Sequence, residues 1–260
     1  MTSTAAHTSD GAQRASATSA VIRAEARLFT RELASLFWIV LFPVTLLLVL
    51  GLIPGFRDAD PALGGRRVID LYGPVVILVS MIMAGLMAMP AVVWAYRDAG
   101  ILRRLRTTPV KPESLIGAQV LLHAAAVLAS TLLVLIVGQL VLDTSLPQSW
   151  IGYAVAYVLV LVASFSLGSV VTALAPNARV GTTLGTIAFF ASMFTAGVYY
   201  PVDGMSGTLR DTVELTPLGA ATQAMNAAMV GDFPDPRHLL VVGAWALVLS
   251  LLSARFFRWE

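Results

Sequence analysis

A serine and a histidine are the residues of this chain whose types could do covalent chemistry. Ser206 lies in the string Gly-Met-Ser-Gly, residues 204–207, and His238 follows it along the chain. A serine hydroxyl that is activated by a neighbouring histidine can attack a carbonyl group. The same glycine-rich string is also common in turns, so the pattern leaves a catalytic pair and an ordinary loop both open.

ATP binding and metal binding lack the residues that they require. A phosphate-binding loop of the Gly-x4-Gly-Lys-(Ser/Thr) type needs a lysine after a glycine. The only lysine, Lys111, lies between Val110 and Pro112. The chain has no cysteine and no His-Glu-x-x-His pair, so we expect neither a metal nor a cofactor in this chain.

A basic cluster is the third candidate. Residues 96–113 hold five of the seventeen cations, namely Arg97, Arg103, Arg104, Arg106 and Lys111. On a helix that starts at Arg97, three apolar residues form one narrow arc and the arginines occupy the rest; the three are Ile101, Leu102 and Leu105. We expect Pro109 and Pro112 to end the helix. Such a helix either lies on anionic lipid or docks in a groove of another protein.

Composition places these candidates in a membrane. The 260 residues are 57% hydrophobic and only 12% charged, about half the charged share of a soluble domain. A helix that crosses the hydrocarbon needs about 20 apolar residues. The sequence therefore predicts an all-α polytopic membrane protein with six transmembrane helices, at about residues 35–53, 71–96, 115–142, 150–174, 180–199 and 239–256.

The cations predict the orientation of these helices. If both termini are cytoplasmic, twelve of the seventeen basic residues fall on the inside and only five on the outside: Arg57, Arg66, Arg67, Arg210 and Arg237. That split obeys the positive-inside rule. It makes the basic cluster a cytoplasmic loop between the second and third spans. The small, polar residues 1–20 read as a disordered cytoplasmic tail.

Ionisable residues are scarce inside the predicted spans. His123 lies near the cytoplasmic boundary of the third span, and Gln139 and Asp143 lie at its outer end. No span carries a charge at its midpoint. Proton-driven transporters and ion channels use such groups, so their absence argues against both classes.

Two stretches of the chain resemble permeases of type-2 ABC transporters, a family of ATP-driven exporters. The string RDAGILRRLRTTPV is similar to the segment after the second span of those permeases, with matches at Gly100, Ile101, Leu102, Arg104, Leu105, Thr108 and Pro109. A second string, residues 189–225, is similar to their fifth span and outer loop, with matches at Ala196, Gly197, Val198, Pro201, Pro217 and Leu218. Asp98, Ala99, Phe189 and Phe190 depart from the pattern. The resemblance makes residues 21–258 one transmembrane permease domain.

The resemblance implies a contact with a separate ATPase subunit, which would bind ATP and Mg. Residues 97–108 would be the coupling helix, through Arg97, Asp98, Gly100, Ile101, Leu102, Arg104, Leu105 and Arg106. The amphipathic segment 21–33 would be the connecting helix. Its Arg23, Arg27 and Arg31 share one face. The same segment is also compatible with an ordinary helix at the lipid interface.

The resemblance also places the first and fifth spans at the contact between two permease subunits, beside the transport path. The fifth span carries the small-xxx-small pattern of Gly181 and Gly185, followed by a series of hydroxyl side chains. Candidate residues there are Gly181, Thr182, Thr183, Gly185, Thr186, Ser192 and Thr195. Packing within one subunit, with the hydroxyls bonded to their own helix, is the alternative.

The sequence therefore predicts the permease subunit of an ABC exporter, not an enzyme and not a nucleic-acid-binding protein. It would act in a bacterial plasma membrane, paired with a second copy or a similar permease. Its substrate would be hydrophobic or amphipathic, such as a drug, an antibiotic or a lipid, as in multidrug or antibiotic resistance. The alternative is a rhomboid-like intramembrane serine protease that uses Ser206 and His238, although Ser206 falls in an outer loop.

Overall fold

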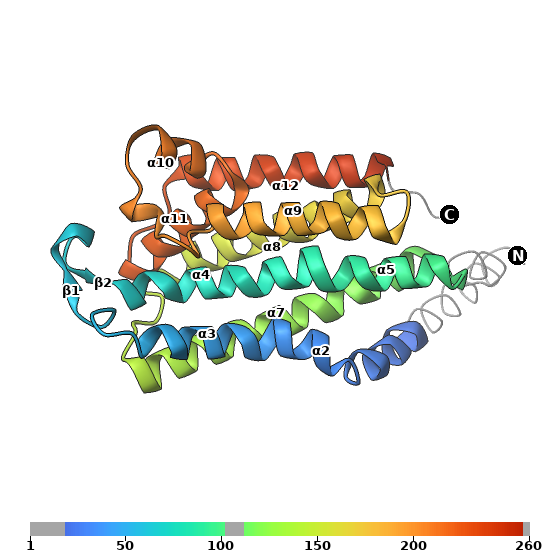
Figure 1. Ribbon diagram of the computed structural model, residues 1–260, viewed down its shortest axis with the longest axis horizontal. Coiled ribbons are helices and arrows are strands. Elements are labelled where there is room, and N and C mark those ends of the chain that lie inside the picture. The colour runs from blue at the N-terminus through green and yellow to red at the C-terminus, as the bar shows by residue number, and fades with distance from the viewer. Residues whose placement is uncertain (1–18, 102–111, 257–260) are drawn as a thin grey trace, which may run out of the picture.

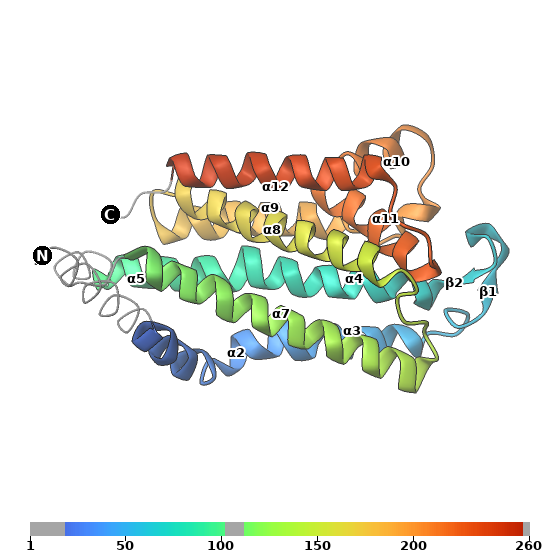
Figure 2. The ribbon, with the colours of Figure 1, turned by 180° about the vertical axis from the view of Figure 1, so that it is seen from behind.

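In the computed structural model, residues 19–101 and 112–256 are described, and their long helices lie side by side in one bundle (Figure 1). Helical residues 19–29 and the end of the last helix lie at one end of the bundle (Figures 1 and 2). A small hairpin and two short helices cover the opposite end. Helix α5 (Met89–Asp98) ends and helix α9 (Ala178–Thr195) begins at the same end as residues 19–29, so Arg97 and Arg179 lie away from the hairpin and the short helices.

The first two spans are each a chain of helical pieces. The first consists of α2 (Leu33–Leu36), the π-helix η1 (Phe37–Leu41) and α3 (Phe42–Gly51). The second consists of α4 (Val68–Ile82), the π-helix η3 (Met83–Ala88) and α5 (Met89–Asp98). Between them, β1 (Ala59–Asp60) pairs antiparallel with β2 (Arg66–Arg67) around the 3-10 turn η2 (Pro61–Leu63).

The remaining long helices are continuous, and the loop before the last one, which the sequence predicts to be an outer loop, folds into short helices. The long helices are α7 (Pro112–Leu142), α8 (Trp150–Leu174), α9 (Ala178–Thr195) and α12 (Pro236–Phe256). The outer loop holds η4 (Val202–Gly204), α10 (Gly207–Glu214) and α11 (Pro217–Val230).

Five of the six predicted spans are confirmed. Within the described residues, five helical stretches are long and apolar enough to cross a membrane: Leu33–Gly51, Val68–Asp98, Ser114–Leu142, Trp150–Leu174 and Pro236–Phe256. The sixth, α9, has 18 residues and lies in the bundle, but Arg179 and its glycines and threonines make it less apolar. Its crossing of the membrane therefore stays a prediction, and the all-α membrane fold is confirmed.

The second span is the centre of the bundle. Its most apolar window is 72% buried, whereas the corresponding windows of the first and last spans are 17% buried. Helix α8 approaches it closely at Gly168, where a Cβ atom would overlap the carbonyl oxygen of Gly85. Because Gly85 and Gly168 have no side chains, the two backbones come into contact at this crossing, as is typical of helix packing in membranes.

Candidate functional site

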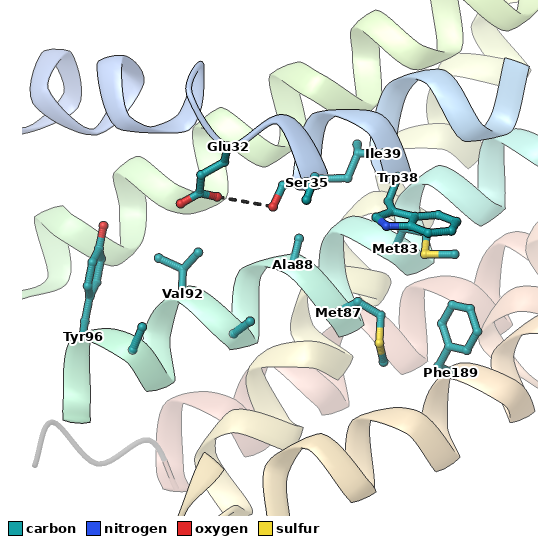
Figure 3. Close-up of a pocket in the computed structure, with 13 residues that line it drawn as sticks. Glu32, Ser35, Trp38, Ile39, Met83, Met87, Ala88, Val92, Tyr96 and Phe189 are labelled. Atoms are coloured by element: carbon teal, nitrogen blue, oxygen red, sulfur yellow. Dashed lines mark hydrogen bonds between the residues drawn. The ribbon is translucent and has the colours of Figure 1, made fainter. Parts of the chain in front are cut away.

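An apolar cavity of about 610 Å³ opens between the first and second spans. One wall comes from α2 and η1, the other from η3 and α5, and Phe189 of α9 closes one end. Figure 3 shows Trp38 and Phe189 at that end. The lining is Glu32, Ala34, Ser35, Trp38, Ile39, Met83, Met87, Ala88, Ala91, Val92, Ala95, Tyr96 and Phe189. Cavities of this size and character suit drug-sized apolar ligands.

The polar groups of the cavity gather at its other end. Glu32 accepts a hydrogen bond from the hydroxyl of Ser35, 3.3 Å between oxygens, and Tyr96 lies across the opening from them (Figure 3). The other lining residues are aliphatic, aromatic or methionine. Methionine is flexible and polarisable, so Met83 and Met87 can adapt to ligands of different shape.

Both cavity walls contain a π-helical turn that comes just before a proline. Pro43 follows η1 and Pro90 follows η3, and neither has a backbone N–H to donate to the preceding turn. In the first wall, the buried hydroxyl of Ser80 donates to the carbonyl of Ile39 at 2.7 Å and supplies a partner from the second span. The wide turns were not predicted from the sequence, although the two prolines were the signal for them.

Helix α9 presents its glycines to its own chain. A Cβ at Gly181 would collide with the indole of Trp94, and one at Gly185 would lie 3.3 Å from the carbonyl oxygen of Leu86. The structure therefore assigns the two glycines to packing within one subunit, which was one of the two alternatives. A contact of this helix with a second subunit stays a prediction.

The threonines of α9 lie on the opposite, exposed side. Thr182, Thr183 and Thr186 line a shallow hollow with Arg179 and Ile187. Their hydroxyls donate to carbonyls of their own helix, as do those of many membrane threonines. Thr195 likewise bonds to Ser192 and is half-buried. The predicted residues therefore lie on two faces of α9. Gly181 and Gly185 pack inward, and Thr182 and Thr186 lie on an exposed face that no other described part of the chain covers.

The segment expected to form one helix from Arg97 onward is interrupted. Helix α5 ends at Asp98, and Gly100 adopts φ +66°, a left-handed conformation that glycine allows at helix ends. Arg97 belongs to α5, and its Nη1 donates to the carbonyl of Thr172 on α8 at 3.0 Å. A coupling helix would therefore begin at Ile101. The prediction of one continuous helix from Arg97 onward is wrong for residues 97–100. Leu102, Arg104, Leu105 and Arg106 lie outside the described residues.

A buried carboxylate ties the N-terminal helix to the second and third spans, and sequence reasoning missed it. Glu25 is 7% exposed and accepts hydrogen bonds from Tyr96 and from Gln119, each 2.6 Å long. Beside them, the ring of Phe29 meets the buried ring of His123 edge-on. Glu25 lies between two exposed arginines, Arg23 and Arg27, each two residues away, so its position in the sequence suggested exposure to solvent. Only its neighbours in space reveal its role.

Tyr96 connects this cluster to the cavity. Its hydroxyl bonds to Glu25, and its side chain also lines the polar end of the cavity. Any displacement of residues 19–29 would therefore act directly on the cavity wall.

The outer loop is fixed by a network of charges that includes His238. Nε2 of His238 lies 3.5 Å from Glu214, and the same carboxylate is bound by Nε of Arg210 at 2.7 Å. Ser206 is exposed and precedes α10 without a side-chain cap hydrogen bond. The imidazole therefore faces a carboxylate that binds it as part of an ion network, and the geometry does not favour a Ser206–His238 protease.

Comparison with known proteins agrees with the bundle and its loops. The family model described as ABC-2 type transporter matches residues 16–230. No curated protein matches the chain. The matched region covers most of the sequence, including the N-terminal helix, the cavity, α9 and the outer helices, so the chain belongs to the ABC-2 type transporter family as a membrane-spanning permease subunit.

Proposed function

We propose that the chain is the permease subunit of an ABC exporter, which moves a hydrophobic or amphipathic substrate out of the cell. A separate ATPase subunit would bind ATP and Mg and supply the energy. The observation that carries this proposal is the apolar cavity between the first two spans, with one polar end at Glu32 and Tyr96. An amphipathic molecule matches that distribution, because its apolar body and polar end would each meet a similar surface.

Energy would enter at the end of the bundle that holds residues 19–29 and Ile101. Tyr96 connects both segments to the cavity. It bonds to Glu25 of residues 19–29, and it belongs to α5, which leads on to Ile101. An ATPase that pulls on either segment would shift Tyr96 and open or narrow the polar end of the cavity. The excess of arginine at this end supports a cytoplasmic location.

A second permease subunit would cover the exposed side of α9. Three large apolar side chains are more than 40% exposed on this helix, at Ile187 (63%), Phe190 (57%) and Phe194 (42%). Phe189 of the same helix lines the cavity. A partner seated on α9 would therefore complete the wall of the transport path, with Thr182 and Thr186 at the contact.

Filling the cavity tests the proposal. Ala91 lines the cavity and is exposed to it, so Ala91→Phe adds a ring there without crowding the core. With the ATPase partner and inverted vesicles, we expect ATP-driven uptake of amphipathic fluorescent dyes to fall about tenfold or more, because small misfits in apolar sites already cost this much. Basal ATP hydrolysis should persist.

Ala154→Phe is the matched control. Ala154 is also an exposed alanine on a membrane helix, but it lies in a shallow apolar hollow beside Trp150 and Ile151. Its variant should transport normally. Undiminished dye transport in Ala91→Phe would remove the cavity from the transport path.

A further inference from the structure

A second, polar cavity of about 370 Å³ lies at the opposite end of the bundle, among the outer loops. Its walls come from three separate parts of the chain: the start of α4, the connection between α7 and α8, and the end of α11. The lining residues are Gly65, Arg66, Arg67, Asp70, Leu71, Ser145, Gln148, Asn226, Met229 and Val230. None of these residues takes part in the proposed transport cavity.

The carboxylate oxygens of this cavity are already used. Arg67 donates to both oxygens of Asp70, with Nε–Oδ2 2.8 Å and Nη2–Oδ1 2.7 Å, and Nη2 also reaches the carbonyl of Asp143 at 2.7 Å. The hydrogen bonds that Arg67 donates to Asp70 raise the pKa of Arg67 above its ordinary value, so this guanidinium stays charged. Asp70 is therefore held as a partner of Arg67 and is not available to a cation.

The donors of the cavity, by contrast, remain free. Arg66 uses Nη2 for Asp203 at 2.7 Å and Nε for the carbonyl of Leu63, while its Nη1 has no partner among the described residues. The side chains of Ser145, Gln148 and Asn226 make no hydrogen bond to any residue that the structure describes. The cavity also lies against the first turn of α4, where the helix dipole is positive and backbone N–H groups lack helical partners.

Asn226 is the residue that points to a ligand. It is only 6% exposed, and it lines the cavity from the last turns of α11. Its side-chain amide makes no hydrogen bond to a described residue and stays accessible from the cavity. A ligand that accepts hydrogen bonds would provide the partner that the protein does not.

We propose that this cavity binds the phosphate group of a phospholipid head group. The free donors of Arg66, Ser145, Gln148 and Asn226 surround a space next to a helix N-terminus, and acceptor-rich phosphate matches that set. The one carboxylate of the lining is bound by Arg67, and Arg66 is paired with Asp203 from outside the lining, so the groups that stay free are donors and favour a ligand rich in acceptors.

The position of the cavity favours a lipid as the source of the phosphate. Trp150, Tyr199 and Tyr200 are each more than half exposed, and they lie where α8 begins and α9 ends, at this same end of the bundle. Exposed tryptophan and tyrosine mark the head-group level of a membrane. Gln148 stands two residues before Trp150, so the cavity opens at the depth where lipid phosphates lie.

Two substitutions test the site in the full-length protein purified in detergent. Asn226→Asp is isosteric and places a negative charge inside the cavity, and Gln148→Glu places one at its exposed rim with little risk to folding. Native mass spectrometry would count the phospholipids that stay bound. We expect the unmodified protein to retain one phospholipid per chain and both variants to lose it, with retention reduced about tenfold or more by like-charge repulsion.

Ser206→Glu is the matched control, because it adds the same charge on an exposed loop at the same end but outside the cavity. It should retain the lipid.

A second measurement distinguishes a lipid from a free phosphate compound as the source of the phosphate. Glycerol 3-phosphate and inorganic phosphate are titrated into lipid-stripped protein, and thermal unfolding is followed. Stabilisation by these probes without lipid retention, abolished in both cavity variants, would assign the same site to a free phosphate compound.

The proposal is overturned if both cavity variants retain lipid and respond to phosphate as the unmodified protein does. It is equally overturned if Ser206→Glu loses the lipid to the same extent, because the effect would then be one of overall charge.

Discussion

Glu214 connects α10 to the start of α12. Its carboxylate is 6% exposed and meets Arg210, His238 and, at 3.9 Å, Arg237. Burial raises the pKa of Glu214, but the hydrogen bonds and charges of Arg210 and His238 lower it more, so the net shift is below the ordinary value of 4.5. The carboxylate is therefore more stable in the folded protein than in the unfolded chain.

That shift predicts a pH dependence of stability. Because the folded pKa is depressed, the stabilisation is complete above the unfolded value, near 4.5, and is lost as the pH falls through the folded value. Glu214→Gln should lower the free energy of unfolding by about 1–3 kcal/mol at neutral pH, since charged hydrogen bonds are lost. Thermal unfolding between pH 3 and pH 7 is the measurement.

The same variant should also flatten the loss of stability below pH 5, since the titrating group is gone. Asp211→Asn is the control, because Asp211 is an exposed carboxylate on the same helix, α10. If Glu214→Gln loses stability below pH 5 as the unmodified protein does, other carboxylates control the pH dependence.

At the scale of the element, the first span depends on a bond from another helix. Pro43 removes a backbone donor, and Ser80 bonds to the carbonyl of Ile39 in the π-helical turn that precedes it. Inside a membrane no water replaces a missing partner. The cavity wall is therefore held in its wide turn by the second span.

A pair of substitutions tests this compensation. Ser80→Ala should lower the free energy of unfolding by about 1–3 kcal/mol, because the buried carbonyl of Ile39 loses its partner. In a Pro43→Ala background, the restored N–H can serve the preceding turn, so Ser80→Ala should cost less. Unfolding by denaturant in mixed micelles gives the four values of this cycle.

Thr45→Val is the matched control in the same span. The hydroxyl of Thr45 is exposed and donates to the carbonyl of Leu41 in its own helix, so its removal should change stability little. Equal costs of Ser80→Ala with and without Pro43 would exclude the compensation.

The coupling segment is tested through its apolar residues. Ile101 is half-buried, and Leu105 lies outside the described residues. If both anchor the segment in a groove of the ATPase, the double variant Ile101→Ala, Leu105→Ala should weaken that contact by more than about 1 kcal/mol. Co-purification of the ATPase should fall and export should stop, while membrane insertion stays intact.

Val158→Ala with Val162→Ala is the control for this variant. Both valines are exposed on α8, at 55% and 44%, so the pair removes a comparable apolar surface elsewhere. ATPase binding and export that persist in the Ile101 and Leu105 variant would leave the basic cluster as an orientation signal or a lipid contact.

At the scale of the whole molecule, the bundle has two chemically different ends. Thr30 is exposed at the end that holds the N-terminal helix, and Ser206 is exposed at the end that holds α10. The chain has no cysteine, so single cysteines report on each end without interference. We predict that an impermeant thiol reagent labels Ser206→Cys in intact cells and Thr30→Cys only after the membrane is opened. Labelling of Thr30→Cys in intact cells would reverse the proposed orientation.

The sequence by itself determined the class of the protein and the course of most of its spans. The fourth span was predicted at residues 150–174 and is observed as Trp150–Leu174, and the second was predicted at 71–96 and is observed as Val68–Asp98. These features follow from hydropathy, which the thickness of the bilayer fixes along the chain. The resemblance in residues 97–110 and 189–225 likewise led to the family that the comparison confirms.

Tertiary structure alone decided which side of each helix faces protein. Gly181 packs on Trp94, Glu25 is buried against Tyr96, and His238 meets Glu214, which the order of residues along the chain did not reveal. In a membrane, helix surfaces that face lipid and those that face other helices are both apolar, so hydropathy does not distinguish them. Only the packing of helices from distant parts of the chain places these residues together and forms the two cavities.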